Sequence, residues 1–525
     1  MKKTYKLLTA SFIALSICSC DDFLEPDSKS EFVPKDATSL NELLLGEAYQ
    51  RNDMTGLNIF LNMLDDDIEA APYQNPVDGF DANKYVASFT WQPNMFYMMK
   101  QAGTGHTNIY ESYYQLILGT NAVIDYLPEV TDTEDRINNV KAQAYALRGF
   151  YYFNLVNIFG EPYNSNPDAL GVPLKLNSGI EESNDYLKRK SVAEVYTQVL
   201  SDLHTAEQAY LSLPEADRWS DNYRTSLPMV QLILSRVYLY MENWEKAAEY
   251  AKAVIDNGKF KLHDLNDEPL EKTAADGTIV RNYLVYPTYS SSETIWPYGS
   301  STDMFKWTYD YANQTTENGK MHAYFQASES LLDCYDEYDL RPARYIVKAP
   351  TGNGDALMPM AYGKINIGTT YYLPTNTTGT FGRCLRLSEA YLNYAEAMAM
   401  LGDDKTGEAT WALNTLREKR YGEEDFEEVS PTDSNTLIEF IRDERRRELC
   451  FEGHRWFDLR RWGMPSITHT WHNSATESSV YRLEKGDPLY TVPIPDEALV
   501  MNASLEQNVI FSEKRYPVET ITKEE

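Results

Sequence analysis

The chain is poor in cysteine and histidine, the residues that build disulfide frameworks and zinc sites. Only five of its 525 residues are cysteine and seven are histidine. Beyond residue 20, Cys334, Cys384 and Cys450 are too scattered for a disulfide framework or a metal-site spacing. His469 and His472 lie three residues apart, but no third ligand is near in sequence, so ordinary loop or surface histidines are favoured over a zinc site. We therefore expect no metal and no cofactor.

Positive charge and long apolar runs are also scarce. The 48 lysines and arginines are outnumbered by 79 aspartates and glutamates, which gives a formal net charge of −31. Such a charge repels phosphate backbones, so a nucleic acid partner is not expected, and it repels anionic lipid head groups as well. No segment beyond the first twenty residues approaches the apolar length of about 20 residues that a membrane-spanning helix needs. Any membrane attachment must therefore come from a covalent lipid.

The first residues have the composition of an export signal. Three lysines precede a short apolar stretch over 7–17, and Ser19 and Cys20 follow it. This ending resembles a bacterial lipobox, in which the last cysteine is acylated, and the two aspartates after it resemble the export signal of surface lipoproteins. We expect residues 1–19 to be a signal peptide, Cys20 to carry the lipid, and residues 20–35 to form a flexible tether. The alternative is an ordinary signal peptide cleaved near Ser19.

Apolar residues recur at helical spacing over much of the chain. Clear stripes occupy 141–160 and 191–213, and each ends at a glycine or proline. The stretch 229–260 reads as two helices joined by a short turn, with small residues where the helices must approach, which is typical of a tetratricopeptide hairpin. The same pattern returns at 384–421, so the helical units are interrupted in sequence. Residues 261–383 between them are rich in glycine, threonine, asparagine, proline and tyrosine, which predicts loops with short strands.

Two short stretches of this insert are candidate strands, at 284–286 and 294–296. The expected fold is therefore mainly α, built from helical hairpins, with a packed loop-rich subdomain that contains short strands.

Glutamates recur every fourth residue in the segment 434–463, at Glu444, Glu448 and Glu452. Six arginines lie close to them in sequence: Arg445, Arg446, Arg447, Arg455, Arg460 and Arg461. Catalytic carboxylates with an arginine clamp are one interpretation. A charge network that pins two helices to the scaffold is favoured, because each carboxylate has a ready partner.

Motifs of catalysis and of ion binding are missing. The chain has no nucleophile elbow, no phosphate loop and no H-E-x-x-H sequence, so we predict no catalytic residue and no enzymatic activity. The acidic runs at 65–67 and 333–339 could hold calcium, but neither has the spacing of a calcium loop.

Aromatic residues are abundant, with 39 tyrosines and nine tryptophans. A sugar ring lies flat on such side chains, while neighbouring short polar groups bind its hydroxyls. The stretch 303–314 is the best such cluster, because in an extended chain its alternate aromatic residues share one side. A core strand that buries this stripe is the alternative. The candidate glycan-binding residues are Trp307, Tyr309, Tyr311 and Asp310 in this stretch, and Tyr73, Asn75, Phe96 and Tyr97 in two smaller clusters.

Short motifs along nearly the whole chain resemble the SusD/RagB family of outer-membrane lipoproteins. They include Cys20-Asp21-Asp22-Phe23-Leu24, Phe89-Thr90-Trp91, Gly119-Thr120-Asn121-Ala122, Ala146-Leu147-Arg148-Gly149, Arg386-Leu387-Ser388-Glu389-Ala390 and Tyr490-Thr491-Val492-Pro493-Ile494-Pro495. Each motif alone is short, but their order and the lipobox before them make the resemblance specific.

The resemblance implies one domain over residues 36–525. About four tetratricopeptide-like helix pairs would occupy roughly 36–260 and 384–463, with the insert at 261–383 and a C-terminal segment at 464–525. It further implies a lipid-anchored outer-membrane protein facing the cell exterior, which binds an oligo- or polysaccharide and delivers it to a TonB-dependent transporter of the SusC type. Ligand residues vary between members, so none is carried over by motif.

Two other functions stay open at this point. A relative with the same fold could serve peptide uptake, and would need deep apolar pockets with charged anchors. A repeat scaffold could instead bind a partner protein without any role in transport.

Overall fold

The structure, a computed structural model, describes residues 33–50, 57, 59–73, 82–104, 107–179, 187–220, 223–273, 277, 279–300, 323–350, 357–365, 379–431, 433–510 and 514–523. Helices dominate this part of the chain, as expected. They are α2 (Ala37–Glu47), α3 (Val86–Phe89), α4 (Met95–Gln101), α5 (Ile109–Tyr126), α6 (Glu134–Phe159), α7 (Val192–Leu211), α8 (Leu227–Tyr240), α9 (Trp244–Ile255), α10 (Glu329–Leu332), α11 (Arg341–Tyr345), α12 (Leu387–Met400), α13 (Thr406–Glu418), α14 (Ser434–Leu449), α15 (Arg455–Arg461) and α16 (Asp496–Met501).

The strands are short and pair antiparallel. They are β1 (Ile68–Ala70), β2 (Glu271–Thr273), β3 (Ile279–Arg281), β4 (Thr294–Tyr298), β5 (Phe325–Ala327), β6 (Lys348–Pro350), β7 (Leu357–Pro359), β8 (Arg383–Arg386), β9 (Ile467–His472), β10 (Glu477–Leu483) and β11 (Glu519–Thr522). The pairs are β1–β5, β2–β3, β4–β8 and β6–β7, while β9, β10 and β11 form one three-stranded sheet with β10 in the centre. The sequence prediction of a strand at 294–296 is confirmed by β4.

The predicted strand at 284–286 is wrong. The amide of Leu284 donates to the Arg344 carbonyl and the amide of Tyr286 donates to the Lys364 carbonyl. These two acceptors belong to separate segments, so no ladder forms, although the residues have strand composition.

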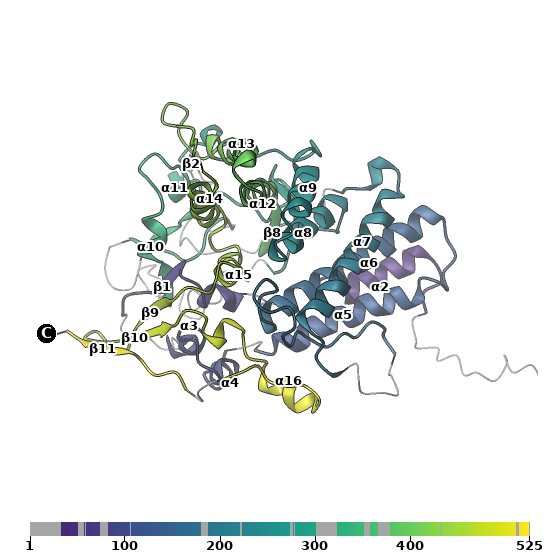
Figure 1. The fold of residues 1–525 in the computed structure, drawn as a ribbon, viewed down its shortest axis with the longest axis horizontal. Helices are drawn as coiled ribbons and strands as arrows, with labels where there is room; N and C mark the ends of the chain where they lie inside the picture. Colours follow the sequence, from purple (N-terminus) through teal and green to yellow (C-terminus); the bar gives the residue numbers. More distant parts are fainter. Residues whose placement is uncertain are drawn as a thin grey trace, which may run out of the picture.

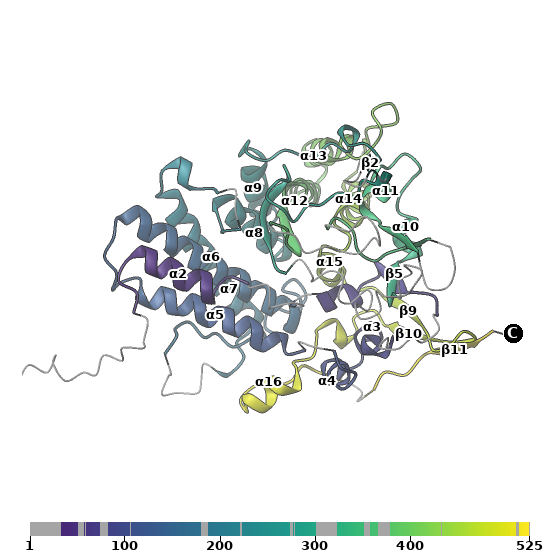
Figure 2. The same cartoon turned by 180° about the vertical axis from the view of Figure 1, so that it is seen from behind.

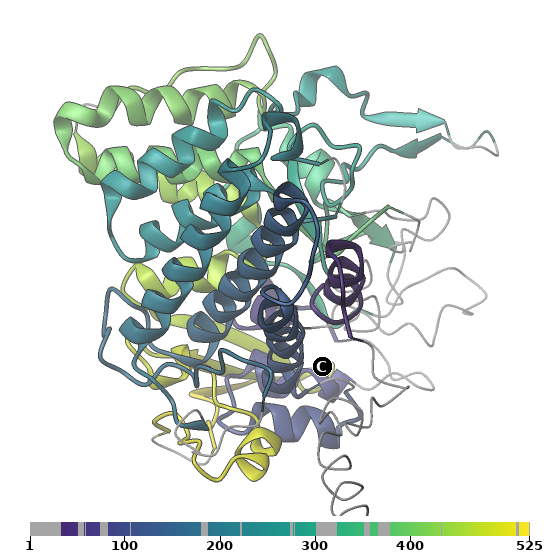
Figure 3. The same cartoon turned by 90° about the vertical axis from the view of Figure 1, so that its right-hand side faces the viewer.

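Successive helices pack side by side across the molecule. Helices α2, α5, α6 and α7 form one group, and α8, α9, α12, α13 and α14 continue the stack (Figure 1). Figure 2 shows the same order from behind, with the strands β9–β11 at the other end of the molecule from α2, and with α3 and α4 on its lower side. Figure 3 shows the β2–β3 hairpin projecting away from the helical stack. Within the described residues, no helix has the length and apolarity that crossing a membrane requires.

The two interrupted helix pairs lie against each other despite their separation in sequence. The α8–α9 pair closes through small residues: the Ser235 hydroxyl donates to the Ala247 carbonyl at 3.0 Å. The α12–α13 pair has the same two-helix form, and its Asn393 amide reaches Ser235 at 3.3 Å. Arg236 and Glu389 form a buried bidentate ion pair between α8 and α12, at 2.5 and 2.6 Å. The packing confirms hairpins at the expected places, whereas their assignment to the tetratricopeptide class stays a prediction.

The three aligned glutamates, two in α14 and Glu452 just after it, form a buried charge network. Glu448 accepts hydrogen bonds from Arg386 and Arg420, and Arg341 bridges Glu448 and Glu444. Burial opposes ionisation of Glu444, but Arg341 and Arg447 outweigh it and lower the pKa of Glu444 to about 2. The charge-network interpretation is therefore confirmed.

Most partners in this network differ from those that proximity in sequence predicted. Within the described part of the chain, Arg447 is the one local arginine that ion-pairs with these glutamates. Arg445 pairs instead with Asp458, Arg446 with Asp67, and Arg461 with Glu396. Arg460 donates to the carbonyls of Asn157 and Gly160, which ties α15 to the end of α6.

Candidate functional site

Strand pairing brings Tyr73 of the second aromatic cluster near β5, in the middle of the insert. β1 pairs with β5 in the register Ile68 to Ala327, and the amide of Ala71 donates to the Tyr324 carbonyl at 2.9 Å. Tyr73 follows two residues later and is partly buried. Tyr324 stands just after the segment that carries the first cluster. Trp307, Tyr309, Asp310 and Tyr311 lie outside the described residues, as does Asn75 of the second cluster.

A set of buried aromatic rings supports this corner. Tyr85 meets Tyr324 edge-to-face with ring centroids 4.6 Å apart, and Phe89 meets Phe325 at 5.0 Å. These contacts pack α3 onto β5, and α4 packs on α3 in turn. We call the region made by β1, β5, α3 and α4 the aromatic corner. Figures 1 and 2 show these elements in the lower half of the molecule. The third predicted cluster, on α4, therefore belongs to the same region as Tyr73 of the second cluster.

Only one of the two α4 candidates faces solvent. Tyr97 is 52% exposed, whereas Phe96 is 5% exposed and packs edge-on against Phe60 with centroids 5.4 Å apart. Neighbouring positions on a helix point about 100° apart, so one side chain can enter the core while the next one leaves it. The prediction of Phe96 as a ligand residue is therefore wrong, because its ring is part of the core.

His469 has a structural role at the base of the corner. Its ring stacks between those of Phe89 and Trp91, with centroids 4.1 and 4.2 Å away. Both ring nitrogens lie within 3.0 Å of backbone carbonyl oxygens, those of Phe89 and Asp65. Since both nitrogens are already engaged, this histidine does not offer a metal ligand.

The acidic runs considered for calcium are engaged in ion pairs. Asp66 pairs with Arg455 at 2.6 Å and Asp67 pairs with Arg446 at 2.8 Å. Burial opposes ionisation of Asp66, but Arg455 outweighs it and lowers the pKa of this carboxyl to about 2. Asp339 of the second run pairs with Arg341. Among the residues that the structure describes, no group of three histidines, cysteines or acids could hold a metal ion.

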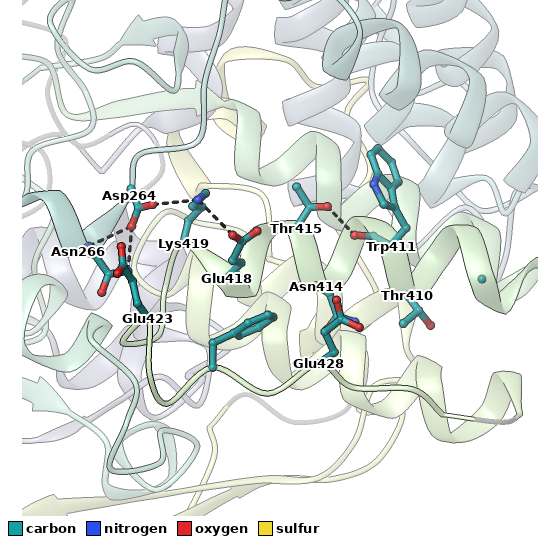
Figure 4. A pocket seen from close by; sticks show the side chains of 12 residues that line it. Asp264, Asn266, Thr410, Trp411, Asn414, Thr415, Glu418, Lys419, Glu423 and Glu428 are labelled. Carbon is teal, nitrogen blue, oxygen red and sulfur yellow. Dashed lines mark hydrogen bonds and ion pairs between the residues drawn. The ribbon is translucent and has the colours of Figure 1, made fainter.

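A groove along α13 was not predicted from the sequence. It has a volume of about 690 Å³, and Trp411, Thr415 and Glu418 of α13 line it (Figure 4). Trp411 is 46% exposed, whereas Ala409, Ala412, Leu413 and Leu416 of the same helix are buried. The sequence did carry a signal, because Trp411 falls outside the apolar stripe that those four residues make.

Comparisons with known proteins agree with this architecture. Residues 361–511 match the SusD family, and residues 24–239 match a family described as starch-binding associating with outer membrane. SusD-like protein P38 of Formosa agariphila is 26% identical over 477 residues, which cover 82% of this chain and 86% of that protein.

Solved structures share the fold. A SusD superfamily protein from Bacteroides thetaiotaomicron superposes with a TM-score of 0.64 at 23% identity, over 90% of this chain and 98% of that chain. A SusD-like carbohydrate binding protein from Bacteroides vulgatus superposes with a TM-score of 0.61 at 20% identity, over 93% of this chain and 94% of that chain. With two family matches at opposite ends of the chain and relatives over most of its length, this chain belongs to the SusD/RagB-like family.

Proposed function

We propose that the protein is a non-enzymatic lipoprotein of the outer membrane that binds an oligo- or polysaccharide and delivers it to a TonB-dependent transporter of the SusC type. The observation that carries the proposal is the match of residues 24–239 to a family described as starch-binding and associated with the outer membrane. The Bacteroides vulgatus structure with the same fold is described as carbohydrate binding, which supports the same function.

The aromatic corner is the proposed glycan site. Tyr97 offers an exposed ring on α4, and Tyr73 follows the β1–β5 pairing. Trp307, Tyr309 and Tyr311 belong to the segment that enters the corner at Tyr324, with Asp310 among them, and Asn75 to the one that leaves it after Tyr73. Flat rings beside carboxylate and amide groups supply both the apolar and the polar contacts of a sugar. The buried aromatic rings beneath α3 and α4 would hold Tyr97 in place before the ligand arrives, which reduces the entropic cost of binding.

The strongest catalytic alternative loses its support. The carboxylates that an arginine clamp could have served, Glu444 and Glu448, are fully buried, so no substrate reaches them. Their bonds to Arg341, Arg386 and Arg420 instead hold α14 in the scaffold. A structural role therefore accounts better for this cluster than a catalytic one does.

Tethering to the membrane would make modest affinity sufficient. A lipid on Cys20 and the tether that follows would keep the protein above its transporter, and a tethered partner acts at a high effective concentration. Cys20 and the tether up to residue 32 lie outside the described residues.

Replacing Trp307 or Tyr97 by alanine is expected to weaken binding of a neutral glycan by ~1–3 kcal/mol, the scale of a lost stacking contact. Isothermal titration of the mature protein with the oligosaccharide selected on a glycan array measures this loss. The ligand is neutral, so the affinity should hardly change between low and high salt.

Leu118→Ala serves as the control for that measurement. Leu118 is 48% exposed, close to the 52% of Tyr97, but lies on α5. Its loss should leave the affinity unchanged. A large fall in melting temperature for Trp307→Ala would show that this side chain belongs to the core. A steep salt dependence, or selection of peptides and of no glycan, would argue for peptide uptake instead.

The variant Cys20→Ala is expected to move the protein from the membrane fraction to the soluble fraction, because the acyl chains are its only proposed attachment. Affinity purification of the wild-type protein after mild detergent extraction should bring down a large β-barrel protein in nearly equal amount. Retention of the variant in the membrane fraction would contradict the lipid anchor, and recovery of the wild-type chain alone would contradict the transporter complex.

A further inference from the structure

The groove along α13 is walled by segments that are fastened to the helix. We call it the α13 groove; it is bounded by α13, by the segment 419–430 after it, and by Asp264 and Asn266 (Figure 4). Its volume of about 690 Å³ falls within the range of roughly 300–1,000 Å³ that is usual for small-molecule and ligand sites.

The segment after α13 is held to the helix by side-chain bonds to its backbone. The Asn414 amide donates to the Val429 carbonyl at 2.9 Å and accepts from the Val429 amide at 3.1 Å. Arg417 donates to the Glu427 carbonyl at 2.8 Å, and its guanidinium lies 5.6 Å from the ring centre of Phe426. The wall that carries Glu423, Phe426 and Glu428 is thereby fixed in place without a ligand.

The opposite wall is fastened in the same way. Lys419 forms an ion pair with Asp264 at 3.0 Å, and the Leu265 amide donates to the Lys419 carbonyl at 3.1 Å. The Asn266 side chain donates to the Tyr421 carbonyl at 2.9 Å. Because these bonds fix both walls without a ligand, the groove is preorganised. Binding would therefore lose little conformational entropy in the walls.

The floor combines an aromatic ring with hydrogen-bonding groups in a line. Trp411, Thr415 and Glu418 fall at positions i, i+4 and i+7 of α13, so they share one face over about 10 Å of helix. Tyr391 and Tyr394 contact the Trp411 ring at centroid distances of 6.0 and 6.1 Å and hold it in place. A ring that is still 46% exposed in this setting can accept the flat face of a sugar.

The charges of the groove select against anionic ligands. Four carboxylates line it, from Asp264, Glu418, Glu423 and Glu428, against the single ammonium of Lys419, which already contacts two of them. An anionic glycan would be repelled. A cation is disfavoured at the ring, because the Lys252 ammonium lies 5.9 Å from the centre of Trp411 and is itself held by Asp256 at 2.5 Å. Neutral hydroxyls remain, and exposed carboxylates accept hydrogen bonds from them.

We propose that the α13 groove is a second binding site for a neutral oligosaccharide, separate from the aromatic corner. The proposal rests on the proposed function of carbohydrate binding. In Figures 1 and 2, α13 lies at the top of the molecule and α4 at the bottom, so the two sites are on different parts of the surface. Two separate sites would bind one long polysaccharide at two points. This raises the overall avidity without any increase in the affinity of either site.

Titration calorimetry of the mature protein with neutral hexasaccharides of glucose and mannose (maltohexaose, cellohexaose and mannohexaose) tests the proposal. The wild-type protein should bind a second equivalent of the hexasaccharide that binds best. Trp411→Ala should weaken that second equivalent roughly tenfold to a hundredfold and leave the first unchanged. Leu118→Ala, at a similar exposure on α5, should leave both equivalents unchanged.

A second variant covers the case in which Trp411→Ala disturbs the fold. Gly407 lines the groove in the first turn of α13, and a Cβ atom built there meets nothing within 4 Å. Gly407→Phe should therefore fit without a clash and obstruct the groove while Trp411 stays in place. We expect the same loss of the second equivalent, with an unchanged melting temperature.

The possible outcomes separate this proposal from the proposed function. If the wild-type protein binds one equivalent that only Tyr97→Ala weakens, the α13 groove is not a site, and the proposed function stands. If no neutral hexasaccharide binds, both proposals fail together. Binding of hexagalacturonate that Trp411→Ala abolishes would overturn the assignment to a neutral ligand.

Discussion

Replacing Glu448 by glutamine is expected to lower the free energy of unfolding by about 3–5 kcal/mol, as loss of one partner in a buried ion pair does. Glu448 is fully buried. It accepts hydrogen bonds from Arg386 at 2.6 Å, from Arg420 at 2.9 Å and from Arg341 at 3.2 Å. Burial opposes its ionisation, but these guanidinium groups outweigh burial and hold the pKa of Glu448 well below its usual range.

The size of this effect follows from what the substitution leaves behind. Glutamine has nearly the same shape as glutamate, so no cavity forms, but its neutral amide cannot balance the guanidinium charges. Those charges are buried away from water, and an uncompensated ion is most costly in a buried position. Because Glu448 contacts Arg341 inside the insert and Arg386 and Arg420 after it, we expect the whole molecule to lose stability, as in a loss of core packing.

Glu439→Gln is the matched control, since Glu439 lies on the same helix. Its side chain is 72% exposed and, among the described residues, forms an ion pair with Arg442, three residues later. Exposed pairs contribute about 0–1 kcal/mol, so the control should unfold almost as the wild-type protein does. Urea unfolding followed by circular dichroism gives both values. Equal stability of the two variants would refute the view that the network holds α14 in the scaffold.

Replacing Gly119 by alanine is expected to destabilise the protein by about 3 kcal/mol or more, the upper range for overpacking a core. Gly119 lies in α5 where α2 crosses it. A Cβ atom at this position would stand 2.2 Å from the carbonyl oxygen of Glu47 and 2.5 Å from the carbonyl carbon. These are backbone atoms, so no side-chain rotation relieves the contact, and the two helices would have to move apart.

The control for this variant lies in the facing helix. Gly46 of α2 is exposed, and a Cβ atom there meets nothing within 4 Å. Gly46→Ala should therefore raise the free energy of unfolding by about 0.5–1 kcal/mol. Alanine has a higher helix propensity than glycine, and it makes the unfolded chain less flexible. The two glycine variants should shift the melting temperature in opposite directions. A Gly119→Ala protein as stable as the wild type would mean that α2 and α5 do not cross this closely.

Most of the fold could be predicted from patterns among residues that are close in sequence. The helices of the two interrupted hairpins follow from apolar spacing and turn residues, because each helix is closed by bonds between residues four apart. The strand at 294–296 followed from composition. The predicted strand at 284–286 failed, since a strand needs a partner, and composition does not say whether one lies beside it.

The candidate site was predictable only in part. Sequence composition led to Tyr73, Tyr97 and the stretch 303–314. The pairing of β1 with β5 adds that the segment before Tyr73 lies beside residues 325–327. The sequence could not separate Phe96 from Tyr97, because the helical face turned to the core depends on what packs against α4. The apolar stripe of α13 does place Trp411 outside the core, but the sequence could not show that a groove lies beside it.

What the sequence by itself determined is the family, the order of the helices and the presence of a buried charge cluster on α14, all of which are readable from neighbouring residues. The tertiary structure alone decided which charges meet. Glu448 is balanced by Arg341 and Arg386, which are 107 and 62 residues away, while the adjacent Arg445 pairs with Asp458. The physical reason is that a helix fixes only the directions of its side chains, and the charge that lies within 3 Å of each one is set by how distant segments pack.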